Sequence, residues 1–275
     1  ALQPHDQKMG GHGMSDMKPT LPISIVALLV VAFLQVPVLV VVLTSFSETS
    51  YLTIPPQGWT LKWFAEVLSD PVYIRAIRNS LILAVSSTLL SLALGVAAAY
   101  ALFRKAIPGS EAITALLMAP MIVPSVVIGV AMLQYVTLVG LRGSFLVLIV
   151  AHVVITVPYI LRSALASLSG LDVSVEEAAR VLGADGFTAF RLVTLPLIKP
   201  GLVAGALFAF VTSMENVPVT IFLASARQTT LPILIFSSVE MGVNPGVAAI
   251  STLLIVATVI VLLLAERWTG FHKFV

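Results

Sequence analysis

The stretch VEEAARVLGADGFTAFRLVTLPLIKPG, residues 175–201, is a long, charged, helix-forming segment in an otherwise apolar chain. Apolar sequences that carry almost no charge for about twenty residues lie on both sides of it, which is roughly the length that crosses a bilayer. The segment therefore separates two hydrophobic stretches, and its role decides how the chain is organised. Its charged residues are Glu176, Glu177, Arg180, Asp185, Arg191 and Lys199.

The composition of the whole chain is that of a membrane protein. Of the 275 residues, 59% are hydrophobic and 10% are charged, and the mean hydropathy is +1.07. A soluble domain is about 45–50% apolar and about 25% charged, and one soluble core cannot hide such an excess. The net charge of +2 gives no indication of a nucleic-acid partner. The lack of cysteine excludes disulfides and thiolate chemistry.

Hydropathy predicts an all-α polytopic membrane protein with six transmembrane helices, because a spanning helix needs about 20 apolar residues. Residues 1–20 are expected to form a disordered cytoplasmic leader, and residues 21–275 the six-helix transmembrane domain. Pro120 and Pro124 are expected to kink the third span. The predicted spans are about residues 21–45, 80–103, 112–136, 145–165, 202–224 and 247–265.

The distribution of Lys and Arg predicts the orientation, because cytoplasmic loops carry an excess of both. With a cytoplasmic N-terminus, ten of the fifteen Lys and Arg residues lie inside and five lie outside. Both termini and segment 174–200 are then cytoplasmic, and loops 46–79 and 225–246 lie outside. The outer aromatic residues Trp59, Trp63 and Phe64 fit either a membrane-interface belt around an amphipathic helix or the docking of an external binding protein.

One face of the charged segment is a narrow apolar stripe. Val175, Ala178, Ala179 and Leu182 fall at positions i, i+3, i+4 and i+7 of a helix. A helix that lies on lipid is expected to carry large apolar residues and a strongly basic polar face. This stripe is rich in alanine and is flanked by two adjacent carboxylates, so the residues favour a protein partner over a lipid surface.

Local signals divide segment 174–200 into two short helices. Ser174 is expected to cap the first, with Glu177 completing a capping box. Gly183 is expected to end it in the left-handed conformation, and Asp185 to cap a second helix that runs to about residue 193. The residues expected to close this second helix and return the chain to the membrane are Pro196 and Pro200.

The same segment resembles the EAA signature of the membrane-spanning subunits of bacterial ABC importers. That signature is Glu-Ala-Ala, three residues, Gly, nine residues, an aliphatic residue, one residue and Leu-Pro; here the aliphatic position holds valine. The stretches SFSETSYLTIPPQGWTLKWF and SMENVPVTIFL are similar to permease subunits of spermidine/putrescine-type importers. The matching positions are Glu177-Ala178-Ala179, Gly183, Val193 and Leu195-Pro196.

The resemblance implies the MetI-like permease fold, a bacterial inner-membrane location and a helix that couples the chain to an ATPase. The implied partners are a homologous second permease subunit, a cytoplasmic ATPase dimer, a periplasmic or lipid-anchored substrate-binding protein and membrane lipid. The implied coupling residues are Glu176, Glu177, Ala178, Ala179, Arg180, Gly183, Asp185, Leu195 and Pro196.

No covalent chemistry is expected of this chain. The sequence contains no G-x-x-x-x-G-K-[ST] motif, and the dipeptide Gly-Lys occurs nowhere in it. ATP and Mg are therefore expected on a separate ATPase, and no cofactor, metal or catalytic residue is expected here. A membrane enzyme is disfavoured because the spans show no nucleophile elbow, metal-ligand pair or paired catalytic carboxylates.

A carboxylate in the predicted fifth span is the main candidate for contact with a substrate. Glu215 is costly inside a membrane, which makes it a functional candidate; a hydrogen-bonded buried carboxylate is the alternative. Spermidine/putrescine-type subunits often have an acidic pair here, whereas this chain has Glu-Asn. The resemblance implies a polyamine-like organic cation. The candidate pathway residues are Ser213, Glu215, Asn216, Gln134 and Tyr135.

Several alternatives stay open at this point. An ion-gradient-driven transporter or channel could use Glu215, but it would leave the EAA segment unexplained, and no internal repeat is visible. Importers of ferric iron, thiamine, phosphonates, opines or amino acids have related subunits. His152 could bond a neighbouring helix or act as a ligand, and the Gly201-x-x-x-Gly205 spacing indicates close helix approach.

Overall fold

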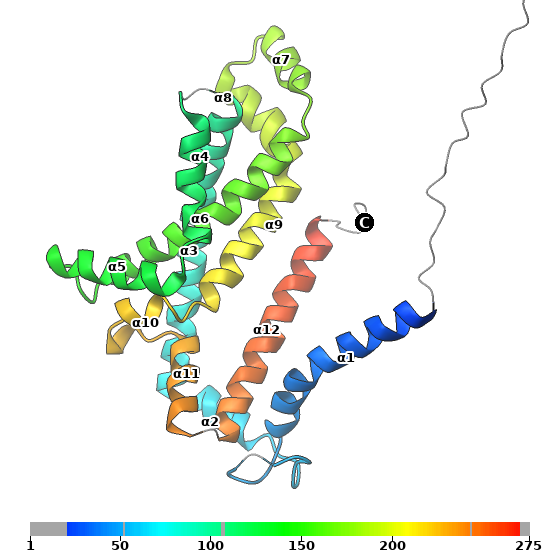
Figure 1. The fold of residues 1–275 in the computed structure, drawn as a ribbon, viewed down its shortest axis with the longest axis vertical. Coiled ribbons are helices and arrows are strands. Elements are labelled where there is room, and N and C mark those ends of the chain that lie inside the picture. Colours follow the sequence, from blue (N-terminus) through cyan, green and yellow to red (C-terminus); the bar gives the residue numbers. More distant parts are fainter. Residues whose placement is uncertain (1–20, 52, 106–107, 243, 270–275) are drawn as a thin grey trace, which may run out of the picture.

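The computed structural model describes residues 21–51, 53–105, 108–242 and 244–269, and every regular element within them is helical. Figure 1 shows the helices as one elongated bundle from which α1 and α5 project. The short non-α elements are the 3-10 turns η1 (Ala119–Met121) and η3 (Ala226–Gln228) and the π turn η2 (Phe190–Thr194). The α-helices are α1 (Leu21–Thr44), α2 (Lys62–Ser69), α3 (Pro71–Phe103), α4 (Ser110–Met118), α5 (Ser125–Leu138), α6 (Phe145–Ser169), α7 (Val173–Val181), α8 (Gly186–Ala189), α9 (Leu195–Met214), α10 (Thr220–Leu223), α11 (Leu231–Met241) and α12 (Pro245–Thr269).

The number of spans predicted from hydropathy is confirmed. Five described helical segments are long and apolar enough to cross a membrane, and a sixth arises if the bent pair 110–121 and 125–138 counts as one span. The expected kink in this pair is a bend of 99°. Pro120 lies in η1 and Pro124 precedes α5; a proline ring clashes with the preceding turn, so both residues favour a break. As a result, α5 projects sideways from the bundle (Figure 1).

The centre of the bundle is built from α3, α6 and α9, which pack along one another. Small residues allow this close approach. A Cβ atom added at Gly205 on α9 would lie 2.9 Å from Cβ of Ser163 on α6, and one added at Gly95 on α3 would lie 2.8 Å from Cβ of Ile160. Gly201 is equally crowded by Ser167. The predicted glycine spacing on the fifth span therefore marks a true close helix contact.

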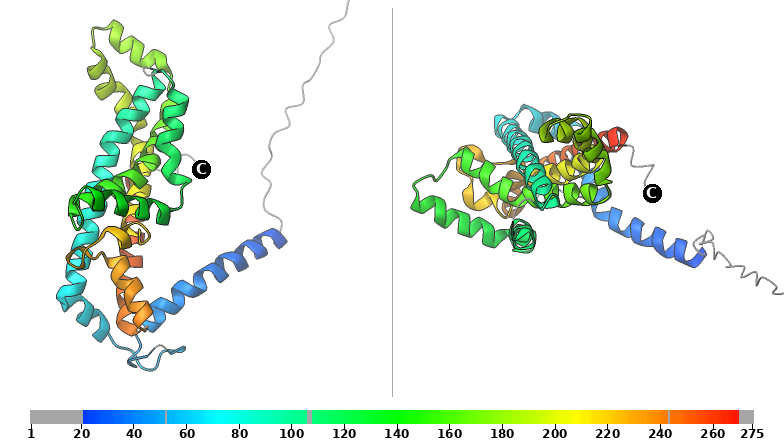
Figure 2. Two further views of the ribbon diagram at one scale, coloured as in Figure 1. Left: turned by 60° about the vertical axis from the view of Figure 1, so that its left-hand side comes forward. Right: turned by 90° about the horizontal axis from the view of Figure 1, so that it is seen from above.

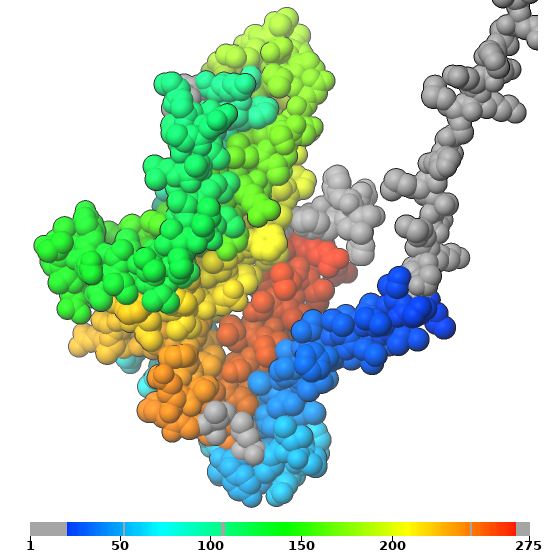
Figure 3. Space-filling model, in the orientation of Figure 1, coloured from blue at the N-terminus to red at the C-terminus, as the bar shows by residue number. Residues whose placement is uncertain are grey.

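The first helix contributes almost nothing to this core. Apolar side chains of α1 are exposed along nearly its whole length, and only its last residue, Thr44, is buried. It meets α12 near that end and diverges from the bundle toward its start (Figures 1 and 3). Such a surface is unfavourable in water and favourable in a bilayer, so the exposure fits a membrane-spanning chain.

The fifth span differs from its prediction at both ends. Helical structure runs without interruption from Gly186 to Met214, so Pro196 and Pro200 do not close a helix. Pro196 lies in the first turn of α9, and the π turn η2 lies directly before it. A proline ring crowds the carbonyl group four residues earlier. In a π turn the backbone hydrogen bonds join residues i and i+5, so the bonding pattern near that carbonyl differs from that of an α-helix. The predicted end at residue 224 was also wrong, because α9 ends at Met214.

Both predicted outer loops contain helical residues that were not expected, namely the first turns of α3 in one and α11 in the other. Asp70 caps α3 by accepting a hydrogen bond from the amide of Val72 at 2.7 Å, so this helix begins nine residues before the predicted start at residue 80. Predicted loop 225–246 contains α11. It is held against α3, because the amide of Leu231 donates to the hydroxyl of Ser80 at 2.8 Å and Nδ2 of Asn79 donates to the carbonyl of Arg227 at 3.1 Å.

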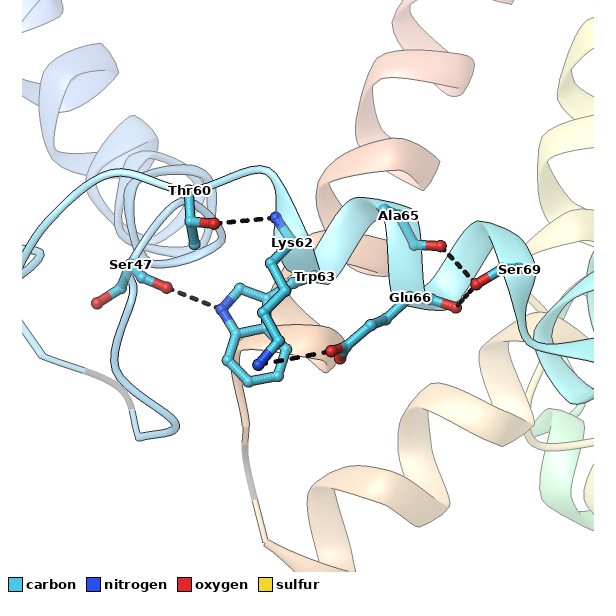
Figure 4. A network of polar contacts seen from close by, with 7 residues as sticks. All are labelled: Ser47, Thr60, Lys62, Trp63, Ala65, Glu66 and Ser69. Carbon is cyan, nitrogen blue, oxygen red and sulfur yellow. Dashed lines mark hydrogen bonds and ion pairs between the residues drawn. The ribbon is translucent and has the colours of Figure 1, made fainter.

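The expected amphipathic outer helix is α2. Its Trp63 Nε1 donates to the carbonyl of Ser47 at 2.8 Å, which ties the helix to the segment after α1 (Figure 4). Lys62 and Glu66 form an ion pair along its exposed side at 3.7 Å. Val67 is buried in a cluster that joins α2 to α3, α11 and α12. These contacts anchor α2 to the rest of the chain, whereas the membrane-interface belt and the docking of a binding protein both stay predictions.

Candidate functional site

The charged segment lies at the opposite end of the bundle from α2, as Figures 1 and 2 show. It consists of α7, a short turn and α8, which continues through η2 into α9. The cap of α7 is Asp172, which accepts a hydrogen bond from the amide of Ser174 at 2.9 Å. The prediction that Ser174 caps the helix was therefore wrong by two residues. Aspartate satisfies the free amides of a helix start as well as serine does.

The predicted glycine elbow is present. Gly183 follows α7 with φ +97°, a backbone conformation that side-chain-bearing residues rarely adopt. Asp185 then caps α8 by accepting from the amide of Thr188 at 2.6 Å. Hydrogen bonds from Thr188, by its side chain and by its amide, hold the pKa of the Asp185 carboxyl below its ordinary value. The two helices therefore meet at a fixed turn, as the sequence predicted.

Several large apolar side chains of this segment are exposed. Val181 and Leu182 are 87% and 89% exposed, and Phe187 on α8 is 70% exposed. Glu177 and Ala178 are also exposed beside them. An exposed group of large apolar residues with a charged rim is typical of a protein-interaction site. Leu182 already belongs to the predicted apolar stripe, and Val181 and Phe187 are two further large apolar residues exposed near it.

Glu176 faces a different side of α7 from Glu177, because neighbouring residues on a helix lie about 100° apart. It is 6% exposed and accepts hydrogen bonds from Tyr100 Oη and Thr194 Oγ1, both at 2.7 Å, and it forms an ion pair with Arg104. Glu176 therefore lies off the exposed surface of α7, and its part in coupling stays a prediction. Burial raises the pKa of Glu176, but the hydrogen bonds and the nearby guanidinium outweigh it and hold that pKa below its ordinary value.

Two further residues of the predicted coupling set also lie away from the exposed tip. Leu195 is half-buried against the core of α3, α6 and α9, and Pro196 lies in the first turn of α9. Arg180 faces a cleft of about 700 Å³ between α3 and α8, which Tyr100, Arg104 and Phe187 also line. The sequence did not identify Tyr100, Arg104 and Thr194 as functional residues. Arg104 could be recognised only as a charged residue at the membrane edge, because it directly follows a predicted span.

Glu215 directly follows α9, whereas the prediction placed it inside a helix that ran to residue 224, toward the outer half of that span. It is exposed and lines a groove of about 280 Å³ between α9 and α12, together with Met214 and Thr258. The alternative of a fully buried carboxylate is therefore wrong for the isolated chain. The chain after Glu215 leaves the helix and continues to α10, so the groove sits beside irregular backbone within a membrane-spanning region.

The other predicted pathway residues do not share this groove. Asn216 is buried and accepts from the amide of Val219 at 2.9 Å, which fixes the turn after α9. Ser213 is buried within the bundle. Gln134 and Tyr135 are exposed on α5, which packs against α6 and α10 and not against α12. Within the described residues, the structure leaves Glu215 as the predicted pathway residue that faces the groove.

A closed network of polar side chains surrounds Ser213. His152 is completely buried; its Nδ1 lies 2.7 Å from Ser213 Oγ and its Nε2 lies 2.9 Å from Thr220 Oγ1. Ser213 Oγ lies 2.9 Å from Ser87 Oγ on α3. The network thus joins α3, α6, α9 and α10, and it confirms the interpretation of His152 as an interhelical hydrogen-bonding residue. Within the described residues, no group of three or more His, Asp or Glu side chains could hold a metal ion.

Comparison with known proteins gives a consistent result. Residues 91–269 match the family described as binding-protein-dependent transport system inner membrane component. The chain is 31% identical over 235 residues to the spermidine/putrescine transport system permease protein PotC of Escherichia coli K12, covering 86% of this chain and 89% of the relative. It is 35% identical over 244 residues to the putrescine transport system permease protein PotI of the same strain, covering 86% of each.

More distant matches include proteins named for other substrates, and the solved structures among them support the fold. The molybdate/tungstate transport system permease protein WtpB of Thermococcus kodakarensis is 27% identical over 245 residues, covering 88% of this chain and 92% of the relative. A solved bacterial ABC transporter involved in alginate import matches with a TM-score of 0.72 and 18% identity, covering 89% of this chain and 94% of that chain. The MetNI methionine ABC transporter matches with a TM-score of 0.60 and 20% identity, covering 72% and 94%.

Proposed function

Because the chain belongs to the family of binding-protein-dependent transport system inner membrane components, we propose that it forms half of the pathway for a polyamine-like organic cation. The family assignment makes it a multi-pass inner-membrane permease subunit of an ABC importer and favours this function over an ion-driven transporter. The substrate class is supported by two relatives, the spermidine/putrescine permease PotC and the putrescine permease PotI.

The observation that carries the substrate proposal is the exposed Glu215 carboxylate in the groove between α9 and α12. A carboxylate within a membrane-spanning region is costly unless it has a role, and it attracts an ammonium group. It would repel an oxyanion such as molybdate, which argues against the substrate named for the relative WtpB. Only one acid stands here, so the second positive group of a diamine would need a partner on the other permease subunit.

We also propose that the exposed tip of the charged segment docks on a separate cytoplasmic ATPase dimer, which binds ATP and Mg. The tip presents Glu177 and Ala178 beside the apolar residues Val181 and Leu182. An apolar centre with a charged edge suits a protein groove with a basic rim. The exposure of Glu177 and the burial of Glu176 support a docking surface that contains Glu177 and not Glu176. The remaining proposed partners are a homologous permease subunit and a substrate-binding protein.

Uptake of radiolabelled spermidine and putrescine tests the substrate class. Cells that carry the complete transporter should accumulate at least one of the two, and deletion of this chain should abolish that uptake. Glu215→Gln should raise the half-saturating concentration about fivefold, the loss expected for an ion pair worth about 1 kcal/mol. Glu240→Gln is the matched control, because Glu240 is an exposed acid on α11 that does not line the groove. Uptake of molybdate with no uptake of either amine would overturn the proposal.

A further inference from the structure

The two adjacent carboxylates of α7 divide into one that faces outward and one that holds the helix to the membrane bundle. Glu177 is exposed, whereas Glu176 is 6% exposed and touches groups from two other elements. Tyr100 and Arg104 belong to the end of α3, and Thr194 belongs to η2, the turn that leads into α9. A single side chain therefore joins three parts of the chain, because its partners Thr194 and Tyr100 lie 18 and 76 residues away from it in the sequence.

The two carboxylate oxygens of Glu176 divide these contacts between the two helices. Oε1 accepts from Tyr100 Oη at 2.7 Å and pairs with the Arg104 guanidinium, so it is tied to α3. Oε2 accepts from Thr194 Oγ1 at 2.7 Å, so it is tied to the start of α9. Hydrogen bonds to a charged acceptor are about twice as strong as neutral ones. Rotation of α7 away from either helix would break at least one of them.

A second contact reinforces this junction. The rings of Tyr100 on α3 and Phe190 in η2 lie 4.6 Å apart, and the Arg104 guanidinium lies 5.7 Å from the centre of the Tyr100 ring. Both rings border the buried core of α3, α6 and α9. The charged cluster and the aromatic pair therefore lie together where α7 meets the bundle. Beyond them, α7 packs mainly on α8 and η2.

We propose that Glu176 is the positioning residue of the coupling segment, which fixes α7 to α3 and α9 so that a displacement of the exposed tip is passed to the membrane helices. The proposal rests on the proposed coupling function. It assigns different tasks to neighbouring residues: Glu177 contacts the partner, and Glu176 transmits the movement. Loss of Glu176 should leave docking intact while α7 moves independently of the bundle.

The chain offers a direct physical test because it contains no cysteine. Spin labels at Val173→Cys on α7, which is not among the proposed docking residues, and Leu94→Cys on α3 occupy exposed positions. The distance between them is measured by pulsed electron spin resonance in the complete complex, without nucleotide and with ATP bound to a hydrolysis-deficient ATPase. A narrow distance distribution is expected in both states for the unmodified segment. Glu176→Ala should broaden it, and the matched variant Glu177→Ala should leave it narrow.

Two further readouts separate transmission from docking. Glu176→Ala should retain the co-purifying ATPase, while the ATP hydrolysed per molecule of labelled spermidine taken up rises about fivefold or more, in the range of typical coupling energies. Glu177→Ala should instead weaken ATPase association. If Glu176→Ala prevents assembly, Thr194→Val serves in its place, since it keeps the shape of a side chain that is 2% exposed and removes the contact to Oε2.

The outcomes distinguish this inference from the proposed function. If the unmodified chain never co-purifies with an ATPase, the coupling function fails and the inference fails with it. If the ATPase is present but neither Glu176→Ala nor Thr194→Val changes the distance distribution or the hydrolysis ratio, only the positioning role is overturned. Loss of the ATPase to the same extent in Glu176→Ala and Glu177→Ala would make Glu176 a docking residue and would also overturn it.

Discussion

Two buried polar clusters tie α3 to the long helical segment that ends at Met214, and they do so by different chemistry. The cluster around His152 consists of neutral hydroxyl groups and one imidazole deep in the bundle. The cluster around Glu176 contains a carboxylate and a guanidinium, and it lies where the helices leave the bundle. The side chain of Arg104 is 24% exposed there, so water still reaches the charged pair.

The contrast follows from the cost of charge in each environment. An ionised side chain is expensive inside the hydrocarbon region, whereas hydroxyl groups that bond one another are tolerated. The deep cluster can therefore fix the packing of helices without a net charge. The cluster at the membrane edge can use a stronger ionic contact, which suits a junction that must hold while force is applied to α7.

The largest expected effect is on the charged cluster. Arg104→Met leaves the Glu176 carboxylate buried without its ion pair and should lower the free energy of unfolding by about 2–3 kcal/mol. Unfolding in mixed detergent micelles measures this value. The double variant Arg104→Met/Glu176→Leu should recover most of it, because an apolar pair can replace a buried ion pair. A double variant that is less stable than Arg104→Met alone would contradict this account.

A glycine on α9 provides a test that acts between the two clusters. Gly205→Ala places a Cβ atom 2.9 Å from Cβ of Ser163 and 3.3 Å from Cα of Ile160. Overpacking of this kind costs about 1–3 kcal/mol, and we expect a value near 2 kcal/mol in the same unfolding experiment. Ser163→Gly in the same chain should restore part of the loss. A stable Gly205→Ala variant would show that α6 and α9 can separate without loss of the core.

The deep cluster should respond more weakly. His152→Leu removes two hydrogen bonds but keeps an apolar side chain of similar size, and hydrogen bonds between membrane helices are worth about 0.6 kcal/mol on average. Its partners also keep other contacts, because Ser213 lies 2.9 Å from Ser87 and Thr220 donates to the carbonyl of Asn216 at 2.6 Å. We expect a loss of about 1 kcal/mol. A loss larger than that of Arg104→Met would reverse the ranking of the two clusters.

The sequence predicted the parts of this arrangement that depend on composition and local spacing. Six spans, the proline bend, the turn at Gly183 and the cap at Asp185 follow from hydropathy and backbone preferences, and the structure contains all four. The different roles of Glu176 and Glu177 could not be predicted. Both are glutamates at adjacent positions, and only the location of Tyr100, Arg104 and Thr194 in space decides which one is buried.

Boundaries were less predictable where tertiary contacts overrule local signals. Pro196 and Pro200 normally indicate the end of a helix, yet helical structure continues through both. The helix α11 was hidden in a presumed loop because its eleven residues are too few to cross a membrane. Its position depends on bonds to α3, which no local pattern reveals.

The smallest expected effect on stability at neutral pH is that of the titration of Glu176. In acid, this titration acts selectively on the contacts of that one side chain. Its folded-state pKa lies below the ordinary value of 4.5. Its contribution to stability is therefore fully present above about pH 4.5 and is lost as the pH falls through the lower folded-state pKa. The groups that face it are Arg104, Tyr100 and Thr194.

The spin-label distance between α7 and α3, scanned from neutral to acid pH, checks this prediction. The distribution should stay narrow above about pH 4.5 and broaden as the pH falls through the lower folded-state pKa of Glu176, because protonation removes the charge that pairs with Arg104. Asp172 and Asp185 also have lowered pKa values and cap the same segment, so they add a pH dependence of their own. Glu176→Gln isolates that part, since glutamine does not titrate. A transition of the same size in Glu176→Gln would assign the whole pH effect to the two caps and leave the ionic contact without a role in holding α7.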